Sequence, residues 1–294
     1  MKVVIFLVLA AVAYARNVEP FAPVEPLSAY GYNRDYAIPL AEEIRKAEEQ
    51  MSQERIVGGS ASNLGEFPYQ AGLLSEFVGI AGTGVCGGSL VSPNRVITAA
   101  HCWFDGRDQA WRLTVVLGSV FLFTGGNRIL TTEVVMHPDW NPSLIRNDVA
   151  MIYLPNAVSF TNTIAPIALP SGAELNQNFD SIGAVASGFG LTSDGGFITS
   201  NQLLSHVNLN VITNNVCRMA FPFNVHESNI CTSGAGGTST CRGDSGGPLA
   251  VTSNNRRILI GITSFGSGVG CTVGFPAAFA RVTSFMDFFN QHIV

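Results

Sequence analysis

Charged side chains are scarce in this chain, and lysine is almost missing. Asp, Glu, Lys and Arg make up 13% of the 294 residues, against about 25% in an ordinary soluble protein. Lysine occurs only as Lys2 and Lys46, and the formal net charge is −5. A protein that binds nucleic acid needs a basic cluster, and this sequence contains none. We therefore expect no nucleic-acid partner.

Long apolar runs are also missing after the first residues. Residues 3–13 are apolar, follow Lys2 and precede a small-x-small site at Ala13-Tyr14-Ala15. The run is too short to span a bilayer, and its layout predicts a secretory signal peptide over residues 1–15. A buried strand is the disfavoured alternative, because the run begins at the first residue. The sequence thus predicts a secreted, extracellular protein without a membrane partner.

Cysteine is missing from residues 16–55. The six cysteines are Cys86, Cys102, Cys217, Cys231, Cys241 and Cys271. No two of them have the Cys-x-x-Cys spacing typical of a zinc site, and a secreted protein favours disulfides instead. Six cysteines allow many pairings, so the residues alone leave the connectivity open.

Residues 16–55 differ in character from the rest. They begin with Pro20, Pro23 and Pro26 and end in a charged run at 41–50 that is typical of an exposed helix. We interpret 16–55 as a propeptide that no disulfide holds to the rest once the chain is cut.

The remaining sequence alternates short apolar runs with turn residues, and this pattern favours a β-sandwich or barrel. The 31 glycines agree with many turns. A helix is predicted only at 285–292, where Thr283 or Ser284 can cap it. The expected strands lie at 114–118, 120–123, 149–154, 184–188, 207–212, 248–252 and 258–265.

Three segments carry residues suited to nucleophilic catalysis. Ser245 lies between glycines directly after a carboxylate, in CRGDSGGPL at 241–249. His101 follows an apolar run in VITAAHC, and Asp148 precedes one in NDVAMIYL. A serine needs a base to remove its proton, and the base needs a group that orients it. The alternatives are a plain loop serine, and a strand carboxylate exposed to water.

Other histidines and acids are weaker candidates for these roles. The remaining histidines are interpreted as surface or hydrogen-bonded residues, and the competing acids lie in sequence typical of loops. They are His137, His206, His226 and His292, and Asp105, Asp108 and Asp139.

Five motifs in order identify a resemblance. They are IVGG at 56–59, CGGSL at 86–90, TAAHC at 98–102, NDVA at 147–150 and GDSGGP at 243–248. The chain resembles secreted serine proteases of the chymotrypsin family, and in particular the larval midgut chymotrypsins of insects of the lepidopteran type. The resemblance covers residues 56–294. The order His101, Asp148, Ser245 is that of the triad in chymotrypsin-like proteases.

The resemblance implies an all-β fold of two antiparallel six-stranded barrels with a C-terminal helix. The serine protease domain is then 56–294, with the change of barrel near 166–181. The implied disulfides are Cys86–Cys102, Cys217–Cys231 and Cys241–Cys271. The implied oxyanion hole consists of the backbone N–H groups of Gly243 and Ser245.

Synthesis as a zymogen is also implied. Cleavage after Arg55 by a trypsin-like protease frees the Ile56 ammonium, which then pairs with Asp244. This pairing orders the oxyanion hole and the pocket.

For the primary pocket, the resemblance points to Ser239, Gly266 and Ala277. Ser239 offers no charge at the pocket base, so we expect large uncharged P1 residues such as Phe, Tyr or Leu. Ala277 replaces a commoner glycine and makes an elastase-like preference the alternative. No acidic loop matches the family's calcium site, and neither a metal nor a cofactor is expected.

A digestive endopeptidase of the gut lumen is the resulting expectation, acting as a monomer on protein substrates and subject to protein protease inhibitors. A catalytically inactive homologue that binds partners is disfavoured by the complete triad. A cascade protease is disfavoured by the lack of a cysteine-rich module in 16–55. The missing lysines fit an alkaline fluid containing Lys-cutting proteases, because Arg stays charged where Lys does not; compositional drift is the alternative.

Overall fold

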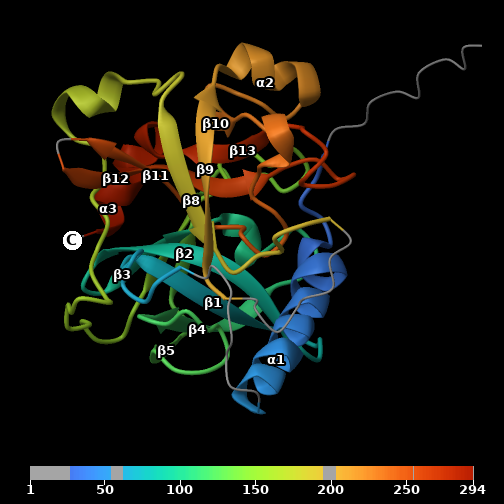
Figure 1. Ribbon diagram of the computed structural model, residues 1–294, viewed down its shortest axis with the longest axis vertical. Coiled ribbons are helices and arrows are strands. Elements are labelled where there is room, and N and C mark those ends of the chain that lie inside the picture. The colour runs from blue at the N-terminus through green and yellow to red at the C-terminus, as the bar shows by residue number, and fades with distance from the viewer. Residues whose placement is uncertain (1–26, 54–61, 195–202, 254, 294) are drawn as a thin grey trace, which may run out of the picture.

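The computed structural model describes residues 27–53, 62–194, 203–253 and 255–293. Two antiparallel β-sheets dominate it and lie one above the other in Figure 1. The expected signal peptide at 1–15 and the expected cleavage site at Arg55 and Ile56 lie outside the described residues. Within those residues, no helix is both long and apolar enough to cross a membrane.

The first sheet has seven strands in the order β5-β4-β1-β2-β3-β7-β6. Its edge strands β5 and β6 are separated by only residues 132 and 133, so the chain itself joins the two edges. The sheet is therefore barrel-like, and it has seven strands rather than the expected six because two residues separate β5 from β6. The strands are β1 (Gln70–Phe77), β2 (Thr83–Ser92), β3 (Arg95–Thr98), β4 (Ala110–Leu117), β5 (Asn127–Thr131), β6 (Val134–Met136) and β7 (Ala150–Tyr153).

The second sheet is a closed six-stranded barrel in the order β10-β13-β12-β11-β8-β9. It confirms the predicted all-β fold of two barrels with a C-terminal helix. Its strands are β8 (Gly183–Gly188), β9 (Ser205–Ile212), β10 (Asn229–Thr232), β11 (Pro248–Ser253), β12 (Arg256–Phe265) and β13 (Ala277–Arg281). The segment between β7 and β8 holds one 3₁₀ turn, Gly172–Asn176, and includes the predicted barrel boundary at 166–181.

Two short helices lie in the second half of the chain, and the sequence predicted only the C-terminal one, so the first of the two is an unpredicted helix. Helix α2 (Asn214–Ala220) is capped by Thr213, whose side chain accepts the Val216 N–H. Helix α3 (Met286–His292) lies at the predicted C-terminal position, but a 3₁₀ turn, Val282–Phe285, precedes it, and neither Thr283 nor Ser284 caps it. Phe288 and Phe289 of α3 belong to a core cluster that contains residues of both sheets, among them Ile97 of β3 and Ile262 of β12.

Helix α1 (Ile38–Gln53) overturns one prediction, because it is not an exposed helix. It lies alongside the first sheet (Figure 1), and its residues Leu40, Ala41 and Ile44 are buried. The predicted strand at 120–123 is also wrong. This segment is an irregular loop, and its apolar side chains belong to the cluster that α1 covers. Residues 120–123 are apolar because they pack against α1, and they do not pair with a strand.

Direct hydrogen bonds connect the two sheets near the middle of the molecule. The Gly87 N–H on β2 donates to the Ser245 carbonyl at 2.7 Å. The Ser187 hydroxyl on β8 donates to Gln70 Oε1 on β1, also at 2.7 Å. Residues from both sheets are therefore held in register at their common boundary.

Candidate active site

His101 and Asp148 are brought together by strand pairing. His101 lies in the turn that follows β3, and Asp148 lies just before β7. These two strands pair with Thr98 opposite Ala150, which places both side chains at the same end of the sheet. His101 Nδ1 is 2.7 Å from Asp148 Oδ2, and the His101 backbone N–H donates to Asp148 Oδ1 at 2.9 Å.

The Asp148 carboxylate is buried and fully hydrogen-bonded. Both His101 and Asp148 are 2% exposed, and a buried charge without partners is costly. A third donor is the Ser264 hydroxyl on β12, 2.6 Å from Asp148 Oδ2. Ser264 comes from the second barrel and was not predicted from the sequence. It makes the orientation of Asp148 depend on both barrels.

Ser245 lies in the turn before β11 and is 7% exposed. The following residue, Gly246, has φ +79°, and a Cβ there would lie 2.2 Å from Thr98 Oγ1. Only glycine fits this position, because both the backbone conformation and the space exclude a side chain. The glycine thus lets the Ser245 turn lie against the strand that leads to His101.

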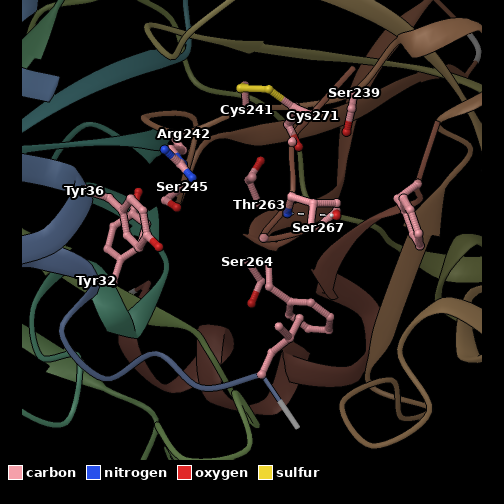
Figure 2. Close-up of a pocket in the computed structure, with 18 of the residues that line it drawn as sticks. Tyr32, Tyr36, Ser239, Cys241, Arg242, Ser245, Thr263, Ser264, Ser267 and Cys271 are labelled. Atoms are coloured by element: carbon pink, nitrogen blue, oxygen red, sulfur yellow. Dashed lines mark hydrogen bonds between the residues drawn. A yellow bond between two sulfur atoms is a disulfide. The ribbon is translucent and has the colours of Figure 1, made fainter. Parts of the chain in front are cut away.

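The contact expected between the base His101 and the nucleophile Ser245 is not made in this structure. His101 Nε2 is buried and has no hydrogen-bond partner among the described residues. The ring of Tyr32 contacts the imidazole edge to face, with centroids 4.7 Å apart. Figure 2 shows Tyr32 and Tyr36 next to Ser245 and Arg242. Tyr32 is a site contact that the sequence did not reveal.

Asp244 is held by two backbone donors. Its Oδ1 accepts the Gly190 N–H at 2.9 Å, and its Oδ2 accepts the Cys241 N–H at 2.8 Å. Burial raises the pKa of the Asp244 carboxyl to about 6, although both N–H groups favour the charged form. Its expected partner Ile56 lies outside the described residues, so their pairing stays a prediction. Gly243, the predicted oxyanion donor, has φ +94° in this loop.

A cavity of about 340 Å³ opens beside Ser245. Ser239 and Gly266, two of the predicted pocket residues, line it, and Figure 2 shows Ser239 beyond the Cys241–Cys271 disulfide. Ala277 does not line this cavity and is buried on β13. Charged groups lining the cavity include Asp194 and Arg242.

Asp194 was not predicted as a site residue. Its carboxylate accepts the backbone N–H groups of Cys271 at 2.6 Å and Thr272 at 2.7 Å, as well as the Thr272 hydroxyl. These contacts, the hydroxyl first, lower the pKa of Asp194 and keep it ionised. The carboxylate therefore adds a negative charge at the cavity wall.

All six cysteines form disulfides, in the pairs Cys86–Cys102, Cys217–Cys231 and Cys241–Cys271. The first connects β2 to the turn that carries His101, and the third connects the Ser245 loop to the cavity wall. Two of these disulfides also lie beside a histidine or an acid, as Cys86–Cys102 with His101 and Cys241–Cys271 with Asp194. Their sulfurs are bonded to each other, so they do not offer thiolate ligands to a metal.

The remaining histidines lie in contacts away from the Ser245 turn. Each has an aromatic or polar neighbour that accounts for its position. His137 contacts the Phe285 ring, His206 contacts the Ser62 hydroxyl, His226 accepts from Arg146, and His292 contacts the Tyr153 hydroxyl.

Comparison with known proteins gives consistent matches over this part of the chain. The family model described as Trypsin matches residues 56–289. A collagenase of Hypoderma lineatum is 39% identical, over 83% of this chain and 89% of that protein. A brachyurin of Leptuca pugilator is 38% identical, over 79% and 96%. A solved structure of HL collagenase covers 81% of this chain and 98% of its own, with a TM-score of 0.72 and 39% identity.

Proposed function

Because this chain belongs to the trypsin family of serine endopeptidases, we propose that it is a secreted digestive zymogen whose active form cleaves after large uncharged P1 residues. The observation that carries the P1 assignment is the uncharged Ser239 beside the cavity. An Arg side chain buried against it without an anion would cost several kcal/mol. The relatives' names include collagenase, brachyurin and trypsin, so the names alone do not decide between specificities.

In the proposed chemistry Ser245 is the nucleophile, His101 the general base and Asp148 the carboxylate that orients the base. Ser245 Oγ attacks the carbonyl carbon of the scissile bond while His101 Nε2 takes its proton. Asp148 holds Nδ1 and stabilises the imidazolium that forms, supported by Ser264. The proton then passes to the leaving amine, and water hydrolyses the acyl-enzyme by the same steps. Backbone N–H groups of Gly243 and Ser245 stabilise the oxyanion.

Activation is proposed to follow cleavage between Arg55 and Ile56 by a trypsin-like protease. The new Ile56 ammonium then pairs with Asp244, whose carboxylate is ready to accept it at neutral pH. Protein substrates and protein protease inhibitors are the remaining proposed partners, and the enzyme acts as a monomer in the gut lumen. The absence of lysine from residue 56 onward supports service in an alkaline, protease-rich fluid.

Matched chromogenic peptides that differ only at P1 test the specificity. We expect kcat/KM for Phe and Leu to exceed that for Arg, and Ser239→Asp to raise the relative rate on Arg. A preference for Arg in the unmutated enzyme would contradict the proposal, and Asp194→Asn would then show whether Asp194 supplies the charge. A preference for Ala over Phe would instead favour the elastase-like alternative.

A further inference from the structure

Residues 27–53, called here the N-terminal arm, lie across the catalytic residues. Tyr32 stacks edge to face on the His101 imidazole at 4.7 Å. Its buried hydroxyl lies beside the Ser245 hydroxyl and the Gly243 backbone. Tyr32 therefore stands where a substrate carbonyl must meet both the nucleophile and the oxyanion donors.

The next residue anchors the arm to the same turn. The buried Asn33 side chain donates to the His101 carbonyl at 3.0 Å, and its backbone N–H donates to Asp105 Oδ2 at 2.9 Å. Arg34 forms an ion pair with Asp108 at 2.7 Å. These contacts fix the direction in which Tyr32 enters the site.

The start of the arm follows the substrate cavity. Leu27, Ser28 and Ala29 line that cavity together with Ser245. Leu27 makes two backbone hydrogen bonds with the Asn224 side chain, at 3.0 and 2.8 Å. The Ala29 N–H donates to the Pro142 carbonyl at 2.8 Å. The arm thus lines the cavity with its first residues and contacts His101 with Tyr32.

Helix α1 holds the arm in place from outside the cavity. Its Leu40, Ala41 and Ile44 pack against apolar residues of the first sheet and the neighbouring loops, namely Leu74, Val85, Leu122, Phe189 and Leu204. The Glu48 carboxylate accepts the backbone N–H groups of residues 122, 123 and 124. Leu40 also touches the site itself, because a Cβ on Gly243 would lie 2.7 Å from Leu40 Cδ2.

The arm's backbone is unsuited to cleavage. Residues Asn33–Ala37 form a π-helical turn that continues into α1, so the chain leaves Tyr32 as a helix. Proteolysis needs the scissile carbonyl aligned with the nucleophile, and here a side chain takes that position. The arm also contains no cysteine, so after a cut at Arg55 only non-covalent contacts hold it.

We propose that the N-terminal arm is a built-in inhibitor that blocks the catalytic cleft with Tyr32 and continues to inhibit the cut enzyme until it dissociates or is degraded. This inference rests on the proposed protease function and adds a second step to activation. Forming the Ile56 terminus is then insufficient, because the cleft must also be vacated. A trypsin-like activator supplies both steps, since Arg34, Arg45 and Lys46 lie within the arm.

The two steps are separated by changing the cleavage site together with the last three residues of α1. In the full chain, Met51→Asp, Ser52→Asp, Gln53→Asp, Glu54→Asp and Arg55→Lys create a site at which enteropeptidase frees Ile56 and leaves the rest of the arm intact. The same chain is prepared with Tyr32→Ala, and with Glu43→Gln as an exposed control on α1. Hydrolysis of a chromogenic Phe peptide is then measured over a wide range of enzyme concentrations.

We expect the activity per mole of cut enzyme to rise on dilution, as the arm dissociates. Tyr32→Ala should reach half of full activity at a concentration at least about tenfold higher, and Glu43→Gln should match the parent within about twofold. Equal, concentration-independent activity in all three immediately after the cut would overturn the proposal.

A cut parent that is inactive at every dilution is treated with immobilised trypsin. Gain of activity as the arm is degraded supports tight inhibition, whereas continued inactivity counts against the proposed protease function. A synthetic peptide of residues 27–53, added to the trypsin-activated enzyme, gives a second measurement. It should inhibit competitively, and its Tyr32→Ala version should have an inhibition constant at least about tenfold higher. No inhibition by the parent peptide at high micromolar concentration would count against the arm as an inhibitor.

Discussion

His101, the proposed general base, is hydrogen-bonded on one side and contacted by an aromatic ring on the other. Nδ1 and the backbone N–H of His101 both contact Asp148, whereas Nε2 is buried without a partner among the described residues and the ring packs edge to face with Tyr32. Removing Tyr32 would open Nε2 to Ser245 without disturbing the bonds to Asp148. Replacing Ser264 should instead remove one of the hydrogen bonds that orient the Asp148 carboxylate.

We predict that Ser264→Ala lowers kcat/KM of the activated enzyme by about tenfold. The hydroxyl donates to a buried carboxylate, and hydrogen bonds to charged groups contribute about 1.5–3 kcal/mol. Ser264→Thr keeps the hydroxyl and should restore most of the activity, which separates positioning of Asp148 from a general packing defect. The exposed Ser284→Ala serves as the control, and unchanged activity in Ser264→Ala would contradict the assigned role.

Alkaline pH should weaken the docking of Tyr32. Burial raises the pKa of the Tyr32 phenol from 10.0 to about 12, with the charges of Asp148 and Asp244 acting in the same direction. Its other neighbours are His101 and the Tyr36 ring that Arg242 covers. A pKa raised in the docked arm means that docking is fully retained below pH 10 and lost as pH rises from 10 to 12.

At pH 11 the arm should therefore bind the cut enzyme about tenfold more weakly than at pH 8. The measurement is the enzyme concentration that gives half of full activity, determined at each pH against arm-free enzyme. Tyr32→Phe keeps the ring on His101 but cannot ionise, so it should lose this pH dependence. Identical profiles for the two chains would show that the phenol does not control release.

Local motifs explain which site residues sequence reasoning finds. Ser245 has glycine neighbours and His101 has an adjacent cysteine, so each is recognisable within a few residues. Ser264 and Tyr32 meet the triad through folding, because Ser264 is 116 positions from Asp148. A lone serine in a strand and a lone tyrosine in the N-terminal arm carry no local signal of such contacts.

At the scale of elements, helix α1 shows that a helix rich in charged residues can still have one apolar face that is buried. The run at 41–50 is rich in Glu, and this composition favours an exposed helix. Its small and apolar positions nevertheless lie on one face, and Ile44 is 1% exposed. The loop at 120–123 supplies the complementary surface, so the two errors in the sequence prediction share one cause.

We predict that Ile44→Ala loosens α1 in the zymogen. Removing buried methyl groups costs about 2–5 kcal/mol, and here that cost falls on docking of the arm. Amide hydrogen exchange at 122–124 should become faster, because these N–H groups donate to Glu48 only while α1 is docked. Glu43→Ala on the exposed face is the control, and the arm-free enzyme should be unaffected because it lacks the helix. Unchanged protection at 122–124 would contradict this.

At the scale of the whole molecule, the two-barrel topology can be predicted from the sequence more easily than the packing between segments that are distant in the chain. Alternating apolar runs and turn residues predict strands, and the family motifs place them in two barrels. The division of one strand into β5 and β6 and the position of the arm depend on packing between distant segments. If the proposed function holds, these parts give the uncut chain two separate reasons for inactivity, namely a covered cleft and an Asp244 carboxylate that has not yet paired with the Ile56 ammonium.

The raised pKa of Asp244 gives a physical reason for this carboxylate to pair with an ammonium group after cleavage. A shift from 3.8 to about 6 means that charging this carboxyl in the zymogen costs on the order of 2–3 kcal/mol. This group's contribution to zymogen stability is present below pH 3.8 and lost as pH rises through 6. An ammonium group at the same place would offset that cost and so favour the active arrangement of the loop.

Asp244→Asn should therefore be cut after Arg55 as the parent is, yet gain little activity. Leaving one partner of a buried ion pair alone costs about 3–5 kcal/mol, so we expect kcat/KM at least about 100-fold below the parent. N-terminal sequencing for Ile56 verifies the cut, and Arg55→Gln provides the uncut reference. Prolonged trypsin treatment degrades the arm, so any remaining deficit belongs to the loop and not to the covered cleft. Full activity of the cut Asp244→Asn enzyme would show that the oxyanion loop orders without this pair, leaving removal of the arm as the sole activating event.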